Sequence, residues 1–139
     1  MYSVDVRVVA PVAATELPER VEQAVREIFP EAELEREADR IVAATHTVET
    51  FAWKLREQRI LDTARGALLT GQSGERIAFE LKKQAAFEGV VNFAVGNEAE
   101  LGDIEVEMVV REPTAEEFVH ALAPPTDEEG RPVEDPFNE

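Results

Sequence analysis

Residues 2–12 read YSVDVRVVAPV, a stretch in which apolar and polar side chains alternate. The apolar members share one face of an extended chain, and they are Tyr2, Val4, Val6, Val8 and Ala10. Asp5 and Arg7 fall on the opposite face. A period of two residues predicts a strand with one buried face and one face in water. The stretch IEVEMVV at 104–110 has the same alternation and predicts a second strand of this kind.

Apolar residues spaced three and four apart predict helices over 15–29 and 48–69. In the second of these the apolar stripe shifts phase near 56–59, so we expect a break there and two helices. Thr114 and Glu117 have the spacing of a capping box and predict a short helix near the end of the chain. The remaining patterns predict a hairpin over 31–46, strands over 77–81 and 91–95, a helical turn over 83–88, and turns at 70–74 and at Gly96-Asn97.

The order of these elements indicates the fold class. Most connections between strands are too short for a helical crossover, so we expect a largely antiparallel sheet with the helices packed on one face, an α+β arrangement. Residues 1–122 are expected to form a single α+β domain. Residues 123–139 are acidic, rich in proline and almost without apolar side chains, which predicts a disordered tail.

Charge is the most informative feature of the composition. The chain of 139 residues has 30 acidic and 14 basic side chains, a formal net charge of −16, and only three of the basic residues are lysines. Such a surface stays hydrated where molar salt screens ordinary charges, which favours a halophilic protein. The alternative is an ordinary acidic protein of a low-salt cell. In both cases the net charge opposes general binding to nucleic acid or to anionic membranes.

The chain contains no cysteine, which excludes a disulfide framework and a thiolate metal site. No apolar run approaches the ~20 residues that cross a bilayer. The opening residues, MYSVDVRVV, lack the pattern of a secretory signal. We therefore expect a cytoplasmic protein that does not contact the membrane.

No motif indicates catalysis. Residues 66–73 have the glycine spacing of a phosphate-binding loop, but Gln72 stands where that loop has its lysine. The histidines, His46 and His120, have neither metal-ligand spacing nor a thiol partner. The sequence thus predicts a protein that is not an enzyme and that holds no cofactor and no metal.

One segment stands against the acidic trend. From Lys54 to Lys83, here called the basic segment, there are seven basic and four acidic residues, whereas the rest of the chain has 7 basic and 26 acidic residues. One interpretation is a surface for an anionic ligand, most plausibly RNA phosphate. The other is that these side chains pair with acidic neighbours across the fold or across a subunit interface.

Several sequence blocks resemble a known family. They are LREQRILDTAR at 55–65, FELKKQAAF at 79–87, Asn92-Phe93 and LGDIEV at 101–106. This combination resembles the archaeal uncharacterised protein family UPF0201, also described as a predicted exosome subunit or RNA-binding protein. The resemblance extends over 2–110. The sequence departs from the family in its many glutamates and in Lys82, where asparagine is expected.

The resemblance implies a fold like that of the large-subunit ribosomal protein that holds five-S RNA, in a homodimer, and it brings no catalytic residues. It favours an RNA-associated protein, an accessory of RNA processing or of a ribonucleoprotein. The RNA-contact candidates are Lys54, Arg56, Arg59, Arg65, Lys82, Lys83, Gln84 and Asn92. The alternative is a dimeric interaction or scaffold protein with no nucleic-acid role, in which the arginines are buried against acids. The orientation of Arg59, Arg65 and Lys83 distinguishes the two.

Overall fold

The computed structural model describes residues 2–94, 102–133, 135 and 137. Within this part of the chain, six strands form one sheet in the order β2-β3-β1-β6-β5-β4, and every neighbouring pair is antiparallel. The strands are β1 (Ser3–Pro11), β2 (Glu33–Arg36), β3 (Arg40–Thr45), β4 (Gln72–Ser73), β5 (Arg76–Lys82) and β6 (Asp103–Glu112). The helices are α1 (Pro18–Ile28), α2 (Glu49–Glu57), α3 (Leu61–Thr70), α4 (Lys83–Ala86) and α5 (Ala115–Leu122).

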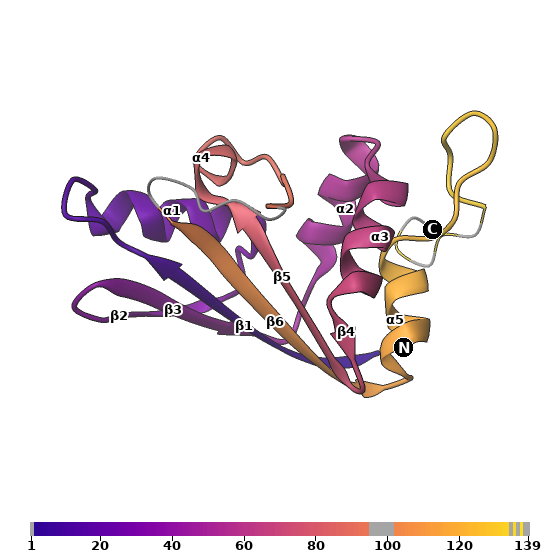
Figure 1. Ribbon diagram of the computed structural model, residues 1–139, viewed down its shortest axis with the longest axis horizontal. Helices are drawn as coiled ribbons and strands as arrows, with labels where there is room; N and C mark the ends of the chain where they lie inside the picture. Colours follow the sequence, from indigo (N-terminus) through magenta and orange to yellow (C-terminus); the bar gives the residue numbers. More distant parts are fainter. Residues whose placement is uncertain (1, 95–101, 134, 136, 138–139) are drawn as a thin grey trace.

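The two strands with the clearest alternation, β1 and β6, pair at the centre of the sheet. Val6 lies opposite Met108 and Val8 opposite Val106, and all four side chains are buried. Helices α1, α2, α3 and α5 cover this face, and none of the described helices lies on the other face of the sheet (Figure 1). The predicted α+β fold with an antiparallel sheet is confirmed.

Aromatic rings connect the helical layer to the edge of the sheet. Phe51 of α2 stacks on Phe29 and on Phe79 of β5, each at 5.7 Å between ring centroids. Phe79 in turn lies 5.5 Å from Phe93. Such pairs contribute beyond the apolar area that they bury. The column therefore fixes the position of β5 relative to α2.

The predicted break within 48–69 lies at Arg59, between α2 and α3. Arg59 has a φ of 58°, in the left-handed region that non-glycine residues rarely adopt. Gln58 fastens this corner to a distant segment, because its side-chain amide donates to the carbonyl of Val91 at 2.8 Å and accepts from the Val91 N–H at 2.9 Å. Two hydrogen bonds therefore fix the corner between α2 and α3 to the segment after α4.

Some boundaries differ from the sequence prediction. Helix α1 begins at Pro18 rather than near Thr15, since proline has a helical φ and needs no N–H partner in the first turn. The predicted turn at 70–74 includes the two-residue strand β4. The predicted strand over 91–95 is a single bridge from Phe93 to Leu81. Residue 95 and the Gly96-Asn97 turn lie outside the described residues.

The described residues after α5, where a disordered tail is predicted, make contacts of their own. Thr126 pairs with Pro132, and the Asp127 carboxylate accepts the N–H groups of Glu129 and Arg131. These contacts form a hairpin over 125–133 that projects from the body of the molecule (Figure 1). Beyond it, Asp135 binds a buried arginine of α2. Disorder over 123–139 stays a prediction.

Candidate nucleic-acid interface

Four of the eight RNA-contact candidates gather around the segment Gly89–Asn92. The Lys54 Nζ donates to the Gly89 carbonyl at 2.6 Å, and the Lys82 N–H donates to the Asn92 carbonyl at 2.8 Å. Arg59 follows Gln58, whose side chain holds Val91. The fold thus brings α2, the α2–α3 corner and the end of β5 to one place.

Most of these side chains face solvent. Arg59, Lys82, Gln84 and Asn92 are exposed, and Lys54 is half-buried. We call the four exposed residues the polar rim. It combines two cations with two amides, and Gln84 joins it from the first turn of α4, two residues after Lys82. The polar rim presents groups that can contact both phosphates and base edges.

Arg56, another candidate, lies in a buried network instead. Its Nη1 donates to the Ala52 and Leu122 carbonyls at 2.7 and 2.9 Å, and its Nη2 to the Ala121 carbonyl at 3.2 Å. Nε and Nη2 also donate to the two carboxylate oxygens of Asp135. All five N–H groups of the guanidinium are therefore satisfied by α2, α5 and the end of the chain.

Lys83 and Arg65 also have structural partners. Lys83 is 1% exposed, and its Nζ donates to the Pro11 carbonyl at 2.5 Å and to Glu16 at 2.8 Å. Arg65 donates to Asp62 at 2.7 Å and to the Ala123 carbonyl at 3.3 Å. The pairing interpretation of the basic segment is therefore correct for Arg56, Arg65 and Lys83. For Arg59 and Lys82, which are exposed, a ligand surface stays a prediction.

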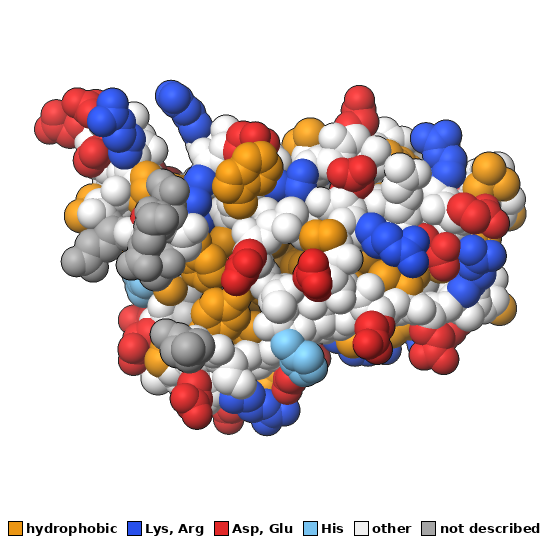
Figure 2. All heavy atoms as spheres, turned by 180° about the vertical axis from the view of Figure 1, so that it is seen from behind, with side chains coloured by type: hydrophobic (Ala, Val, Ile, Leu, Met, Phe, Trp, Pro, Cys, Tyr) orange, Lys and Arg blue, Asp and Glu red, His pale blue; other side chains and the backbone are white. Residues whose placement is uncertain are grey.

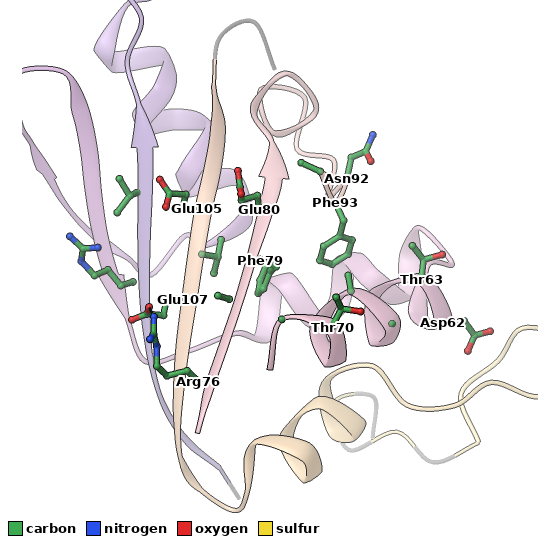
Figure 3. Close-up of a pocket in the computed structure, with 18 residues that line it drawn as sticks. Asp62, Thr63, Thr70, Arg76, Phe79, Glu80, Asn92, Phe93, Glu105 and Glu107 are labelled. Carbon is green, nitrogen blue, oxygen red and sulfur yellow. Dashed lines mark hydrogen bonds and ion pairs between the residues drawn. The ribbon is translucent and has the colours of Figure 1, made fainter. Parts of the chain in front are cut away.

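A groove of about 840 Å³ runs along β5, and Asn92 of the polar rim is one of the residues that line it (Figure 3). Phe79 and Phe93 lie next to one another in its middle, and Thr63 and Thr70 of α3 face them. Asn92 lies at its mouth and belongs to both the groove and the polar rim. The side chains on the open face of the sheet that line its other half are Arg7, Val9, Arg76, Ala78, Glu80, Glu105 and Glu107.

Sequence reasoning did not find this groove. Its lining comes from β1, α3, β5, β6 and the segment after α4, which are far apart in the chain. One local signal existed: Gly66 and Ala67 are small residues of α3, and small residues leave space beside a helix. The distant strands that complete the groove could be assigned only from the topology.

The carboxyl groups of Asp62 and Asp135, which pair with Arg65 and Arg56, have lowered pKa values. Hydrogen bonds from the Thr126 hydroxyl and then from Arg65 lower the pKa of Asp62. Burial by itself raises the pKa of Asp135, but the hydrogen bonds from Arg56 and from the Phe137 N–H outweigh it and leave that pKa below its ordinary value. Both groups thus carry their negative charge at neutral pH.

The charges are mixed over the surface. Figure 2 shows acidic and basic side chains interspersed on one face of the molecule, with apolar side chains between them. Within the part of the chain that the structure describes, no three histidine, aspartate or glutamate side chains gather into a metal-binding group. No described helix has the length and the apolar character needed to span a membrane.

Comparisons with known proteins cover most of the chain, including these residues. A family model described as RNA binding matches residues 5–110. The chain is 36% identical to a UPF0201 protein of Thermococcus kodakarensis over 137 residues, which cover 94% of this chain and 96% of the relative. It is 34% identical to a UPF0200/UPF0201 protein of Archaeoglobus fulgidus, but spans only 41% of that longer relative. It also spans half of a Methanopyrus kandleri UPF0201 protein, at 48% identity.

Solved structures agree with the fold. The crystal structure of a UPF0201 protein from Methanococcus jannaschii has a TM-score of 0.83 at 32% identity, covering 94% of this chain and 99% of that one. A DUF54 protein from Methanothermobacter thermautotrophicus has a TM-score of 0.62 at 20% identity and shows a likeness of fold alone.

Proposed function

This chain belongs to the UPF0201 family and matches the family model described as RNA binding over residues 5–110, and from this premise we propose that it binds RNA through the polar rim. In this proposal it is a non-catalytic accessory of RNA processing or of a ribonucleoprotein. We further propose that it acts in a salt-rich cytoplasm, as a homodimer within an RNA-processing complex.

The observation that carries the proposal is the separation of the basic segment into two parts. Arg56 and Lys83 are buried in ion pairs, whereas Arg59 and Lys82 remain exposed beside Gln84 and Asn92. Cations can bind phosphates, and amides can bind the edges of unpaired bases. The polar rim therefore combines the two kinds of contact that an RNA strand needs.

The acidic composition sets the conditions for binding. A net charge of −16 repels RNA at low salt. In molar salt this repulsion is screened, and the gain from counterion release is also largely lost. Affinity must then come from hydrogen bonds, stacking and shape. For this reason the amides of the polar rim are as important to the proposal as its two cations.

The test is ultraviolet crosslinking of the tagged protein in its own cells, at native salt. The double variant Arg59→Ala/Lys82→Ala removes both cations of the polar rim. The matched control is Arg36→Ala/Arg40→Ala, which removes two half-exposed arginines from β2 and β3 (46% and 43% exposed) and changes the net charge equally. We expect RNA with the wild type and the control, and about tenfold less with the first variant. Equal recovery from both variants would overturn the polar rim as the contact surface.

The second candidate is a protein-interaction scaffold with no nucleic-acid role. The pairs Arg56–Asp135 and Lys83–Glu16 favour it in part, because in them two cations of the basic segment, with little exposed surface, bind carboxylates within the fold. If no RNA is recovered above background from the wild type, the RNA proposal fails. Co-purifying proteins would then identify what the scaffold assembles.

A further inference from the structure

The groove along β5 has the size of a small-molecule site. Its volume of about 840 Å³ lies within the roughly 300–1,000 Å³ that is usual for ligand pockets. It opens directly below Asn92, a residue of the polar rim (Figure 3). A strand that contacts Asn92 therefore reaches the groove.

The middle of the groove offers aromatic rings that are already held in place. Phe79 is half-buried, and it contacts Phe51 at 5.7 Å and Phe93 at 5.5 Å between ring centroids. A fixed ring loses little conformational entropy when a ligand stacks on it. Stacking of a base on an aromatic side chain is worth roughly 1–3 kcal/mol and tolerates any base, because every base has a π-face.

The side of the groove formed by α3 leaves room for a flat ligand. Gly66 and Ala67 belong to its lining and fill little of the space opposite the rings. A Cβ atom built on Gly66 would meet no other atom within 4 Å. Thr63 and Thr70 are exposed on the same helix, so their hydroxyls can bond to the polar edge of a ligand.

Charge determines which part of a nucleotide fits. Four carboxylates, of Asp62, Glu80, Glu105 and Glu107, line the groove against the two guanidinium groups of Arg7 and Arg76. Arg76 already pairs with Glu107. This excess of negative charge disfavours a phosphate inside the groove and accepts an uncharged base. The exposed cations, Arg59 and Lys82, lie outside it on the polar rim.

We propose that the groove is a binding site for one unpaired RNA base, which stacks against Phe79 and Phe93 while the phosphates of its strand lie along the polar rim. This inference rests on the proposed function and narrows it to single-stranded RNA. In a duplex the bases are stacked and paired inside and the phosphates lie outside, so no base can enter the groove. Asn92, at the mouth, contacts the base edge or its sugar.

The experiment uses the full chain in molar KCl and a short single-stranded oligouridine that contains one 2-aminopurine. Affinity is read from the anisotropy of an end label, and stacking from the quenching of 2-aminopurine. Gly66→Leu places a side chain into the groove without a clash at its Cβ, and Gly66→Ala is its matched control. Circular dichroism shows that each variant is folded.

We expect the wild type to bind the strand and quench 2-aminopurine, and Gly66→Ala, which adds only a methyl group to the lining, to lose less affinity than Gly66→Leu. Gly66→Leu should bind at least about tenfold more weakly and quench 2-aminopurine little, because one stacked base is lost. Arg59→Ala/Lys82→Ala should bind weakly but still quench at saturation. Full affinity and quenching in Gly66→Leu would overturn the groove as the base site and leave the proposed function intact.

Two further outcomes complete the test. The same sequence annealed to its complement should bind much more weakly, and equal affinity for the duplex would overturn recognition of an unpaired base. If the wild type binds neither single strand nor duplex, the proposed function itself is wrong, and so is the proposed base site.

Discussion

The guanidinium of Arg56 binds both carboxylate oxygens of Asp135, Nε to Oδ2 and Nη2 to Oδ1, each at 2.6 Å. The two side chains are only 10% and 7% exposed, although 79 positions separate them in the chain. Phe137 lies over the same guanidinium at 5.3 Å and contacts Tyr2. The end of the chain thus packs against α2, α5 and the start of β1.

Replacing Asp135 should therefore destabilise the protein. Asp135→Ala leaves Nε and one N–H of Nη2 without partners in a largely buried site, and removing one member of such a pair costs about 3 kcal/mol. Urea unfolding followed by circular dichroism in molar KCl measures this loss. Glu128→Ala, at an exposed position of the hairpin over 125–133, removes the same charge and should cost less than about 0.5 kcal/mol. Equal unfolding free energies would contradict the role of Asp135.

The same pair should make stability depend on acid. The pKa of Asp135 is lower in the folded protein than its ordinary value of about 3.9. Its contribution is therefore fully present above about pH 4 and is lost as the pH falls through the lower folded pKa. The difference in unfolding free energy between the wild type and Asp135→Asn should shrink below about pH 4. A difference that is constant down to about pH 2 would contradict this prediction.

The neighbouring lysines Lys82 and Lys83 should respond in opposite ways. Lys83→Ala leaves Glu16 buried without its cation and should cost about 3 kcal/mol of stability. Lys82 is exposed, so Lys82→Ala should change stability by less than about 0.5 kcal/mol but weaken RNA binding. Urea unfolding and RNA anisotropy on both variants measure the two effects. If folded Lys83→Ala loses more RNA affinity than Lys82→Ala, the division of the basic segment is wrong.

Alanine substitutions at two glycines of the α3 region, Gly71 and Gly66, should have opposite effects on stability. A Cβ atom on Gly71 would lie 1.8 Å from the carbonyl oxygen of Ala78, so Gly71→Ala must displace backbone and should cost about 3 kcal/mol. At Gly66, inside α3, a Cβ has open space, and Gly66→Ala should stabilise the helix by about 0.5–1 kcal/mol. Thermal unfolding of both variants compares them, and a stable Gly71→Ala variant would contradict the close approach of β5.

The parts of the fold that could be predicted depend on local patterns. The alternation in β1 and β6 and the capping box of α5 appear in the structure as the sequence indicates, and the Thr114 hydroxyl accepts the Glu117 N–H at 3.1 Å. The order of the elements and the short connections between strands predicted the correct fold class. Alternation and helix capping depend only on residues that are close in the chain, so the sequence is enough to predict them.

The parts that could not be predicted depend on distant partners. With 30 acidic residues available, the sequence does not reveal that Lys83 pairs with Glu16 or Arg56 with Asp135. Three of the candidate contacts, Arg56, Arg65 and Lys83, have roles that only the folded arrangement reveals. The groove beside Phe79 also needed the positions of five separate segments.

The position of β6 governs how the molecule can be assembled during translation. β6 is the last strand in the chain but lies between β1 and β5 in the sheet. While the ribosome still holds residues 103–112, the half-sheets β2-β3-β1 and β5-β4 have no strand to join them. Their open edges can then pair with other nascent chains. The two half-sheets can join only after residues 103–112 have emerged from the ribosome, so their strand edges stay open to other chains until that point of synthesis.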